Sequence, residues 1–158
     1  MKVDIAVHGR FHAFELARGL QDRGLLGTLR TTYPAFAVRR VVGPVASLST
    51  APHLELIRRF GQWSGSFDAN DYILPKFGQF VAQNIQRSQS DVLVGWSSAT
   101  LEAITFAQAA GKAVVIDRGA SHIRSQNIIL NEAYREAGLE FPGIPRNVMD
   151  REEAEYEA

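Results

Sequence analysis

The sequence of 158 residues contains no cysteine. This absence excludes disulfide bonds, metal sites built from thiolates and a cysteine nucleophile. It also fits a reducing compartment, so we expect the protein to be cytoplasmic.

Long apolar runs and a net charge are missing as well. No stretch reaches the length of apolar residues that a membrane-spanning helix needs. Seventeen Lys and Arg balance seventeen Asp and Glu, so the composition does not favour nucleic acid as a partner. The first residues carry Asp4 inside an apolar run, which is typical of a strand and not of a signal peptide. Peripheral contact with a membrane through a basic or apolar patch stays open.

Several motifs of catalysis and cofactor binding are also absent. Gly9 follows the first predicted strand without the further glycines of a dinucleotide fingerprint, and there is no Walker A sequence. The histidines at positions 8, 12, 53 and 122 lack the spacing of a zinc motif. Residues 95–99 differ from the G-x-S-x-G elbow of serine hydrolases. We therefore expect neither a bound metal nor a cofactor.

The sequence does contain a regular alternation of strand and helix patterns. We predict strands over residues 3–8, 25–32, 91–95 and 113–116, with a weaker one over 41–47. We predict helices over 13–20, 52–60, 71–81, 103–110, 121–137 and 148–158, and a loop over 61–70. Asn70 or Asp71 is the expected cap of one helix and Ser121 of another. This alternation predicts an α/β fold, a Rossmann-like open parallel sheet with helices on both faces, in one domain over residues 1–158.

Polar residues and glycines follow three of the predicted strands, where a ligand would bind. The carboxyl ends of parallel strands meet at one edge of an open sheet, which is where ligands lie in such folds. Backbone N–H groups at a helix start bind anions and sugar or phosphate oxygens, and glycine permits close approach. The candidate contact residues are Gly9, Arg10, His12, Trp96, Ser97, Arg118, Gly119, Ser121, His122 and Gln126.

A structural role is the alternative for each of these candidates. Gly9 is equally explained by the turn, and Trp96 by closing the core at the end of its strand. Arg118 directly follows a buried strand, where a charge is costly unless it is paired, and Asp117 is its nearest partner. His122 shares a helix face with Gln126, which suits a contact residue, although a lone histidine is more often structural.

Two stretches resemble the N-terminal half of the GT-B glycosyltransferases in the large retaining group called family 4. The first, Asp91-Val-Leu-Val-Gly-Trp-Ser-Ser-Ala-Thr-Leu-Glu-Ala103, is similar to the strand and helix that precede the site in that family. The second, Asp117-Arg-Gly-Ala-Ser-His-Ile-Arg-Ser-Gln126, is similar to an E/D-R-G-S-x-H-I pattern of one subgroup. The subgroup also has counterparts of residues 131–134 and 151–156. The resemblance covers most of residues 1–20 and 91–158, whereas residues 34–70 are not diagnostic.

The resemblance implies a fold of two Rossmann-like domains facing a cleft, of which this chain is the N-terminal, acceptor-side domain. The missing C-terminal domain would bind the nucleotide-sugar donor, so the isolated domain is expected to be inactive. The resemblance further implies transfer with retention to a carbohydrate or lipid acceptor, without a bound metal or cofactor. By position, residues 9–12 would face the donor phosphates or the acceptor, and Arg118, Ser121 and His122 would lie near the transferred sugar.

Two other functions are compatible with the same fold. The first is a stand-alone Rossmann-like module that binds a ligand or a partner without catalysis. The second is a small hydrolase or reductase, against which the missing motifs argue. An exposed apolar face would in addition favour a homodimer.

Overall fold

The computed structural model describes residues 1–64 and 68–158. Five strands form one parallel sheet in the order β3-β2-β1-β4-β5. They are β1 (Val3–Val7), β2 (Leu26–Thr31), β3 (Leu48–Thr50), β4 (Val92–Trp96) and β5 (Ala113–Asp117). The predicted Rossmann-like open sheet is confirmed, including the four strands with the clearest patterns.

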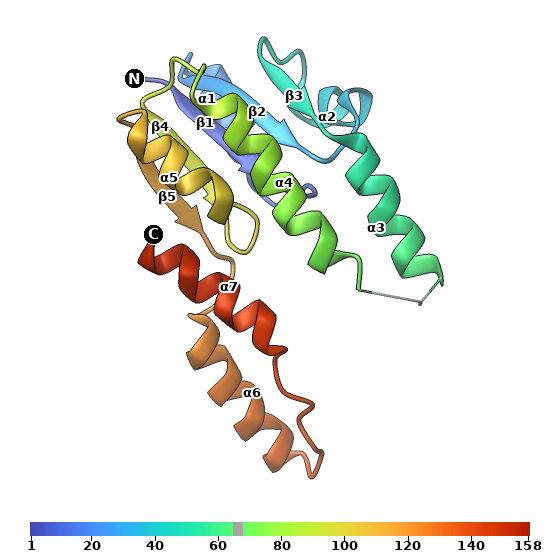
Figure 1. The fold of residues 1–158 in the computed structure, drawn as a ribbon. Coiled ribbons are helices and arrows are strands. Elements are labelled where there is room, and N and C mark those ends of the chain that lie inside the picture. The colour runs from blue at the N-terminus through green and yellow to red at the C-terminus, as the bar shows by residue number, and fades with distance from the viewer. Residues whose placement is uncertain (65–67) are drawn as a thin grey trace.

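Helices cover both faces of the sheet (Figure 1). One face carries α1 (Ala13–Asp22) and α2 (Ala35–Val42), and the other carries α3 (Pro52–Ser64), α4 (Asn70–Ile85) and α5 (Leu101–Ala109). Two further helices, α6 (Ile123–Glu136) and α7 (Arg146–Glu157), lie beyond the carboxyl end of β5 (Figure 1). The described helices therefore form two covering layers and a pair that extends from the sheet edge.

Strand β1 is the centre of the molecule, because all five of its residues are buried. Ala6 and Leu93 pack with the fully buried Phe77 on the α4 side. Ile5 packs with the fully buried Phe14 on the α1 side. Successive side chains of β1 point to opposite faces of the sheet and so contribute to two apolar cores, as expected for a strand covered on both faces.

Asp4 interrupts this apolar strand and forms a buried ion pair. Its Oδ2 accepts a hydrogen bond from Arg30 Nη1 at 2.8 Å, and its Oδ1 accepts one from the Thr28 amide at 2.7 Å. Both charged side chains are almost completely shielded from solvent. The pair joins β1 to β2 within the core.

The predicted strand over residues 41–47 is wrong. Residues 35–42 form α2 instead, and the next strand, β3, begins only at Leu48. Val38 and Val42 lie one helical turn apart and are both buried, so packing of this face outweighs the strand preference of valine. Gly43, with a φ of 88°, ends the helix.

The predicted loop over residues 61–70 is also wrong at both ends. Helix α3 continues to Ser64, and α4 begins at Asn70; residues 65–67 of that prediction lie outside the described residues. The N-cap of α4 is Ala69, not Asn70 or Asp71, and Asp68 Oδ1 accepts a hydrogen bond from the Asn70 amide at 2.9 Å. In the described ranges, no helix combines the length and apolar character needed to cross a membrane.

Candidate functional site

The order of the strands places a topological switch point between β1 and β4. From β1 the chain continues to β2 on one side, and from β4 it continues to β5 on the other. In open α/β sheets, ligands bind at the carboxyl ends of the strands where such connections diverge. His8 follows β1 at this point, and Ser97 follows β4.

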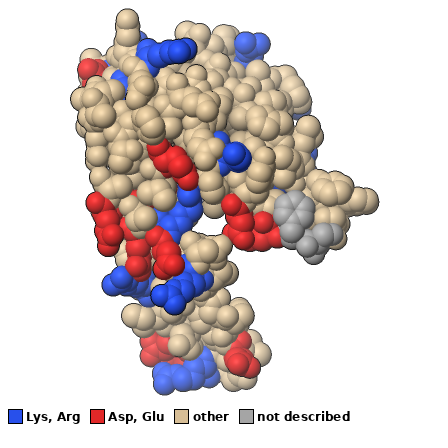
Figure 2. Space-filling view, viewed as in Figure 1, with Lys and Arg blue, Asp and Glu red and all other residues tan. Residues whose placement is uncertain are grey.

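A cavity of about 700 Å³ lies at this switch point. Three structural regions enclose it: the ends of β1 and β4, the start of α4, and one face of α7. Its lining residues are His8, Ser97, Ser98, Asp68, Asn70, Asp71, Leu74, Pro75, Asn147, Val148, Arg151 and Glu152. Figure 2 shows a hollow in the surface with acidic side chains on its right, and with basic side chains on its left beyond which further acidic ones gather.

His8 is a neutral histidine in the wall of this cavity. Burial, with a smaller effect of the Arg58 charge, lowers the pKa of His8 to about 4. Its Nδ1 is shielded from solvent and has no hydrogen-bond partner in the described part of the chain. Nε2 is therefore the ring nitrogen available to a ligand.

Helix α7 closes the cavity by holding the loop that follows β4. The buried Glu155 carboxylate accepts hydrogen bonds from the amides of Ser98 at 2.5 Å, Thr100 at 2.8 Å and Leu101 at 2.9 Å. It thereby satisfies N–H groups at the start of α5, where a negative charge is favoured. Burial raises the pKa of Glu155, and these donors act in the opposite direction. The contacts hold Ser98 in a left-handed conformation, with a φ of 68°.

The two charged α7 residues that line the cavity, Arg151 and Glu152, form ion pairs with other protein side chains. Arg151 donates to both carboxylate oxygens of Glu102, at 2.8 and 2.7 Å, and to the Ser98 carbonyl at 2.5 Å. Glu152 accepts a hydrogen bond from the Ser98 hydroxyl at 2.6 Å and pairs with Arg118. Both charges are therefore balanced by protein side chains.

A second cluster joins the ends of β1 and β5 on the other side of the sheet edge. His12 Nε2 lies 2.7 Å from Asp117 Oδ2, and the His12 ring lies 5.0 Å from the Trp96 ring. None of these three residues lines the cavity. The structure thus brings the predicted His12 and Trp96 together, outside the cavity that the adjacent Ser97 lines.

The two remaining candidates in the turn after β1, Gly9 and Arg10, have different surroundings. The Gly9 amide donates to Thr32 Oγ1 at 2.9 Å, and its carbonyl accepts from Thr31 Oγ1 at 2.8 Å. Gly9 has a φ of 87°, which the turn requires and other residues rarely adopt. Arg10 projects into solvent and pairs with Glu15 at 3.3 Å.

Arg118 lies between α6 and α7, with only 10% of its side chain exposed. It donates to the Ser121 carbonyl at 2.6 Å and to Gln126 Oε1 at 2.7 Å. The alternative in which Asp117 neutralises Arg118 is wrong, because Glu152 is the partner of Arg118. Five predicted positions therefore cluster at the start of α6: Arg118, the exposed Gly119, Ser121, His122 and Gln126.

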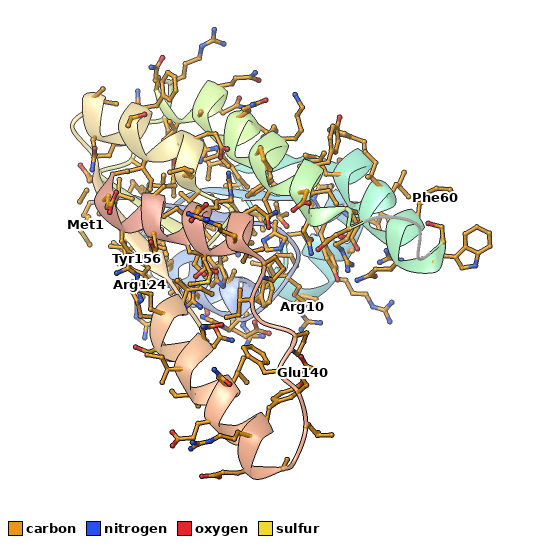
Figure 3. The ribbon with its side chains drawn as sticks, turned by 60° about the horizontal axis from the view of Figure 1, so that its bottom comes forward. Met1, Arg10, Phe60, Arg124, Glu140 and Tyr156 are labelled. Carbon is orange, nitrogen blue, oxygen red and sulfur yellow. The ribbon has the colours of Figure 1, made fainter. Side chains whose placement is uncertain are left out.

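His122 caps α6, which corrects the prediction that Ser121 does so. Its Nδ1 accepts a hydrogen bond from the Arg124 amide at 3.3 Å, and its ring lies 4.8 Å from the Tyr156 ring. Arg124 and Tyr156 are labelled in Figure 3, where α6 and α7 approach each other. His122 is exposed in this position.

The sequence reasoning missed most of the residues that form the cavity. Among the described lining residues, Ser97 is the one that the sequence predicted as a contact residue. His8, Asp71, Asn147 and Arg151 also line the cavity but were not predicted as contacts. One available signal was position, because His8 and Ser97 each come directly after a strand. Another was the spacing of Arg151, Glu152 and Glu155, which puts charged groups on one face of α7.

Among residues 1–64 and 68–158, no group of three or more histidine or acidic side chains is placed to hold a metal ion. No protein-family model, curated protein or solved structure matches this chain.

Proposed function

We propose that this chain is the acceptor-binding half of a retaining glycosyltransferase, which transfers a sugar from a nucleotide-sugar donor. The observation that carries the proposal is the cavity at the switch point between β1 and β4. Its volume of about 700 Å³ lies within the range of small-molecule sites. The resemblance of residues 91–103 and 117–126 to family 4 supplies the reaction class.

The lining of the cavity suits a sugar. The hydroxyl of Ser97 and the amides of Asn70 and Asn147 can both donate and accept hydrogen bonds, as sugar hydroxyls do. Leu74 and Val148 add apolar surface, against which the C–H face of a sugar ring can pack. A saccharide combines these two kinds of surface within one small ligand.

The proposed roles follow from position. His8 and Ser97 hold the acceptor, one from each side of the switch point. His122 and Arg118 contact the transferred sugar when the donor-binding domain faces them, as the resemblance implies. The leaving diphosphate needs positive groups, which by the same resemblance belong mainly to the other domain, so the present chain binds the acceptor without turnover.

A stand-alone binding module without catalysis is the second candidate. The described lining residues come from the ends of β1 and β4, from α4 and from α7, and they present hydrogen-bonding groups to a ligand without a second domain. Binding of a sugar alone is compatible with both candidates. The reaction assay of a chain that includes the second domain distinguishes them.

The experiment measures sugar binding to the 158-residue chain by calorimetry and ligand-observed NMR, with glucose, galactose, mannose and N-acetylglucosamine as probes. We expect one or more to bind, and Ser97→Ala and His8→Ala to weaken binding by about tenfold, the loss of one or two hydrogen bonds. Ser125→Ala, on exposed α6, is the matched control and should leave binding unchanged. No transfer from a nucleotide-sugar should occur.

The absence of binding by all four sugars would overturn the proposal. Equal weakening by Ser97→Ala and Ser125→Ala would show that the sugars bind elsewhere. Turnover by the 158 residues alone would contradict the assignment of the reaction to two domains.

A further inference from the structure

We propose that the cavity selects an uncharged or amine-bearing saccharide and excludes phosphorylated and carboxylated sugars, an inference that rests on the proposed function. The selectivity follows from which charges in the cavity wall are balanced by the protein and which are not. Among the described residues, the acidic side chains that line the cavity are Asp68, Asp71 and Glu152, and the basic ones are Arg151 and His8.

Arg151, the one guanidinium that lines the cavity, is already engaged by the protein. Two of its nitrogens donate to Glu102 in a bidentate pair, and the third donates to the Ser98 carbonyl. A guanidinium used in this way has little capacity left for the oxygens of a phosphate or carboxylate. The charge of Arg151 therefore organises the wall and does not attract an anion.

The other basic group in the wall does not supply a positive charge. His8 remains neutral at neutral pH, because its burial disfavours the imidazolium form. A neutral ring offers a hydrogen bond to a hydroxyl or a ring oxygen, without an ionic attraction for phosphate.

Asp68 and Asp71 provide negative charge that no ion pair within the described ranges balances. Asp71 Oδ1 accepts one hydrogen bond from Asn147 Nδ2 at 2.7 Å. Its other oxygen is available to accept a charge-assisted bond from a sugar hydroxyl or an ammonium group. A phosphate in the same place would meet like charges.

The start of α4 also borders the cavity, and a helix N-terminus ordinarily favours anions. Here the protein supplies the anion itself, because Asp68 Oδ1 accepts the hydrogen bond of the Asn70 amide. Asp71 adds a second negative charge in the first turn of the helix. The positive end of the helix therefore does not offset the acidic wall.

The test compares glucose, glucosamine and glucose 6-phosphate as probes for the 158-residue chain, by calorimetry at pH 7 and low salt. We expect glucosamine to bind at least as tightly as glucose, and glucose 6-phosphate to bind at least about tenfold more weakly. The double change Asp68→Asn with Asp71→Asn should reduce that gap several-fold, as should a high salt concentration. Asp22→Asn, at an exposed position at the end of α1 and at the opposite end of the sheet, is the matched control.

Three results would overturn the selectivity. The first is that glucose 6-phosphate binds as tightly as glucose does. The second is that the difference in affinity between these two sugars persists in the double variant. Either result would leave the proposed sugar site unaffected. The third is the absence of binding by glucose, glucosamine and every other sugar tested, which overturns the proposed function and the selectivity together.

Discussion

Asp4 lies near the start of β1 and His8 directly after its end, and burial has a different consequence for each. Asp4 lies 2.8 Å from Arg30, which forms an ion pair with it. The pKa of His8 is lowered instead, because burial and the Arg58 charge outweigh the opposing effect of Glu55. The sequence places both residues on a predicted strand. It does not show that the partner of Asp4 comes from β2, because that contact depends on the register of the two strands.

The first prediction concerns the buried ion pair. Asp4→Leu should lower the free energy of unfolding by about 3–5 kcal/mol, because it leaves Arg30 buried without a partner. The double variant Asp4→Leu with Arg30→Met should recover much of that loss, since it removes both charges. Urea denaturation of the three proteins measures this. Equal losses in the single and double variants would contradict the assigned pairing.

The second prediction is a pH dependence from His8. In the unfolded chain the histidine binds a proton as the pH falls below about 6.5, whereas in the folded protein it remains neutral until about pH 4. The unfolded state therefore binds more protons in this window, and stability is lost as the pH falls. His8→Gln lacks this contribution, so its thermal melting temperature should fall less steeply from pH 7 to pH 4.5. Parallel curves for the two proteins would contradict the neutral, buried state.

At the scale of elements, helix α7 determines the geometry of the site although it comes last in the chain. Its Glu155 and Glu152 reach the loop after β4, more than fifty residues away in sequence. The alternation of strand and helix patterns predicts α7 as a helix, but local patterns do not indicate what the helix contacts. The residues that close the cavity were missed for this reason.

The third prediction tests the attachment of α7. Glu155→Ala should destabilise the protein by about 1–3 kcal/mol, because three backbone donors near the start of α5 lose their acceptor. Hydrogen exchange should accelerate at the amides of residues 98, 100 and 101. Glu157→Ala, exposed on the same helix, is the control. Unchanged exchange in Glu155→Ala would show that α7 does not hold this loop.

The element boundaries also show where local patterns fail. Periodicity predicts α1, α5 and α6 within a few residues. It fails at α2, where the adjacent Val41 and Val42 favour a strand locally, but Val38 and Val42, one helical turn apart, pack into the core. The cap of α6 is misassigned because both Ser121 and His122 have side chains that can accept the hydrogen bond.

At the scale of the whole molecule, the order of strands decides where the cavity forms. The sequence predicts parallel strands, but five strands in one sheet have many possible orders, and the observed order depends on long-range packing. That order puts the ends of β1 and β4 side by side, so His8 and Ser97 share a cavity. It leaves His12 and Asp117 together on the other side of the edge.

The most direct test of the proposed sugar site is an NMR titration of the isotope-labelled chain with the tightest-binding sugar of the panel. Amide shifts should change at residues 8, 97–98, 147–148 and 151–152, which line the cavity between β1 and β4. Shifts confined to other surfaces, such as residues 33–37 and 55–59 between α2 and α3, or no shifts at all, would contradict it.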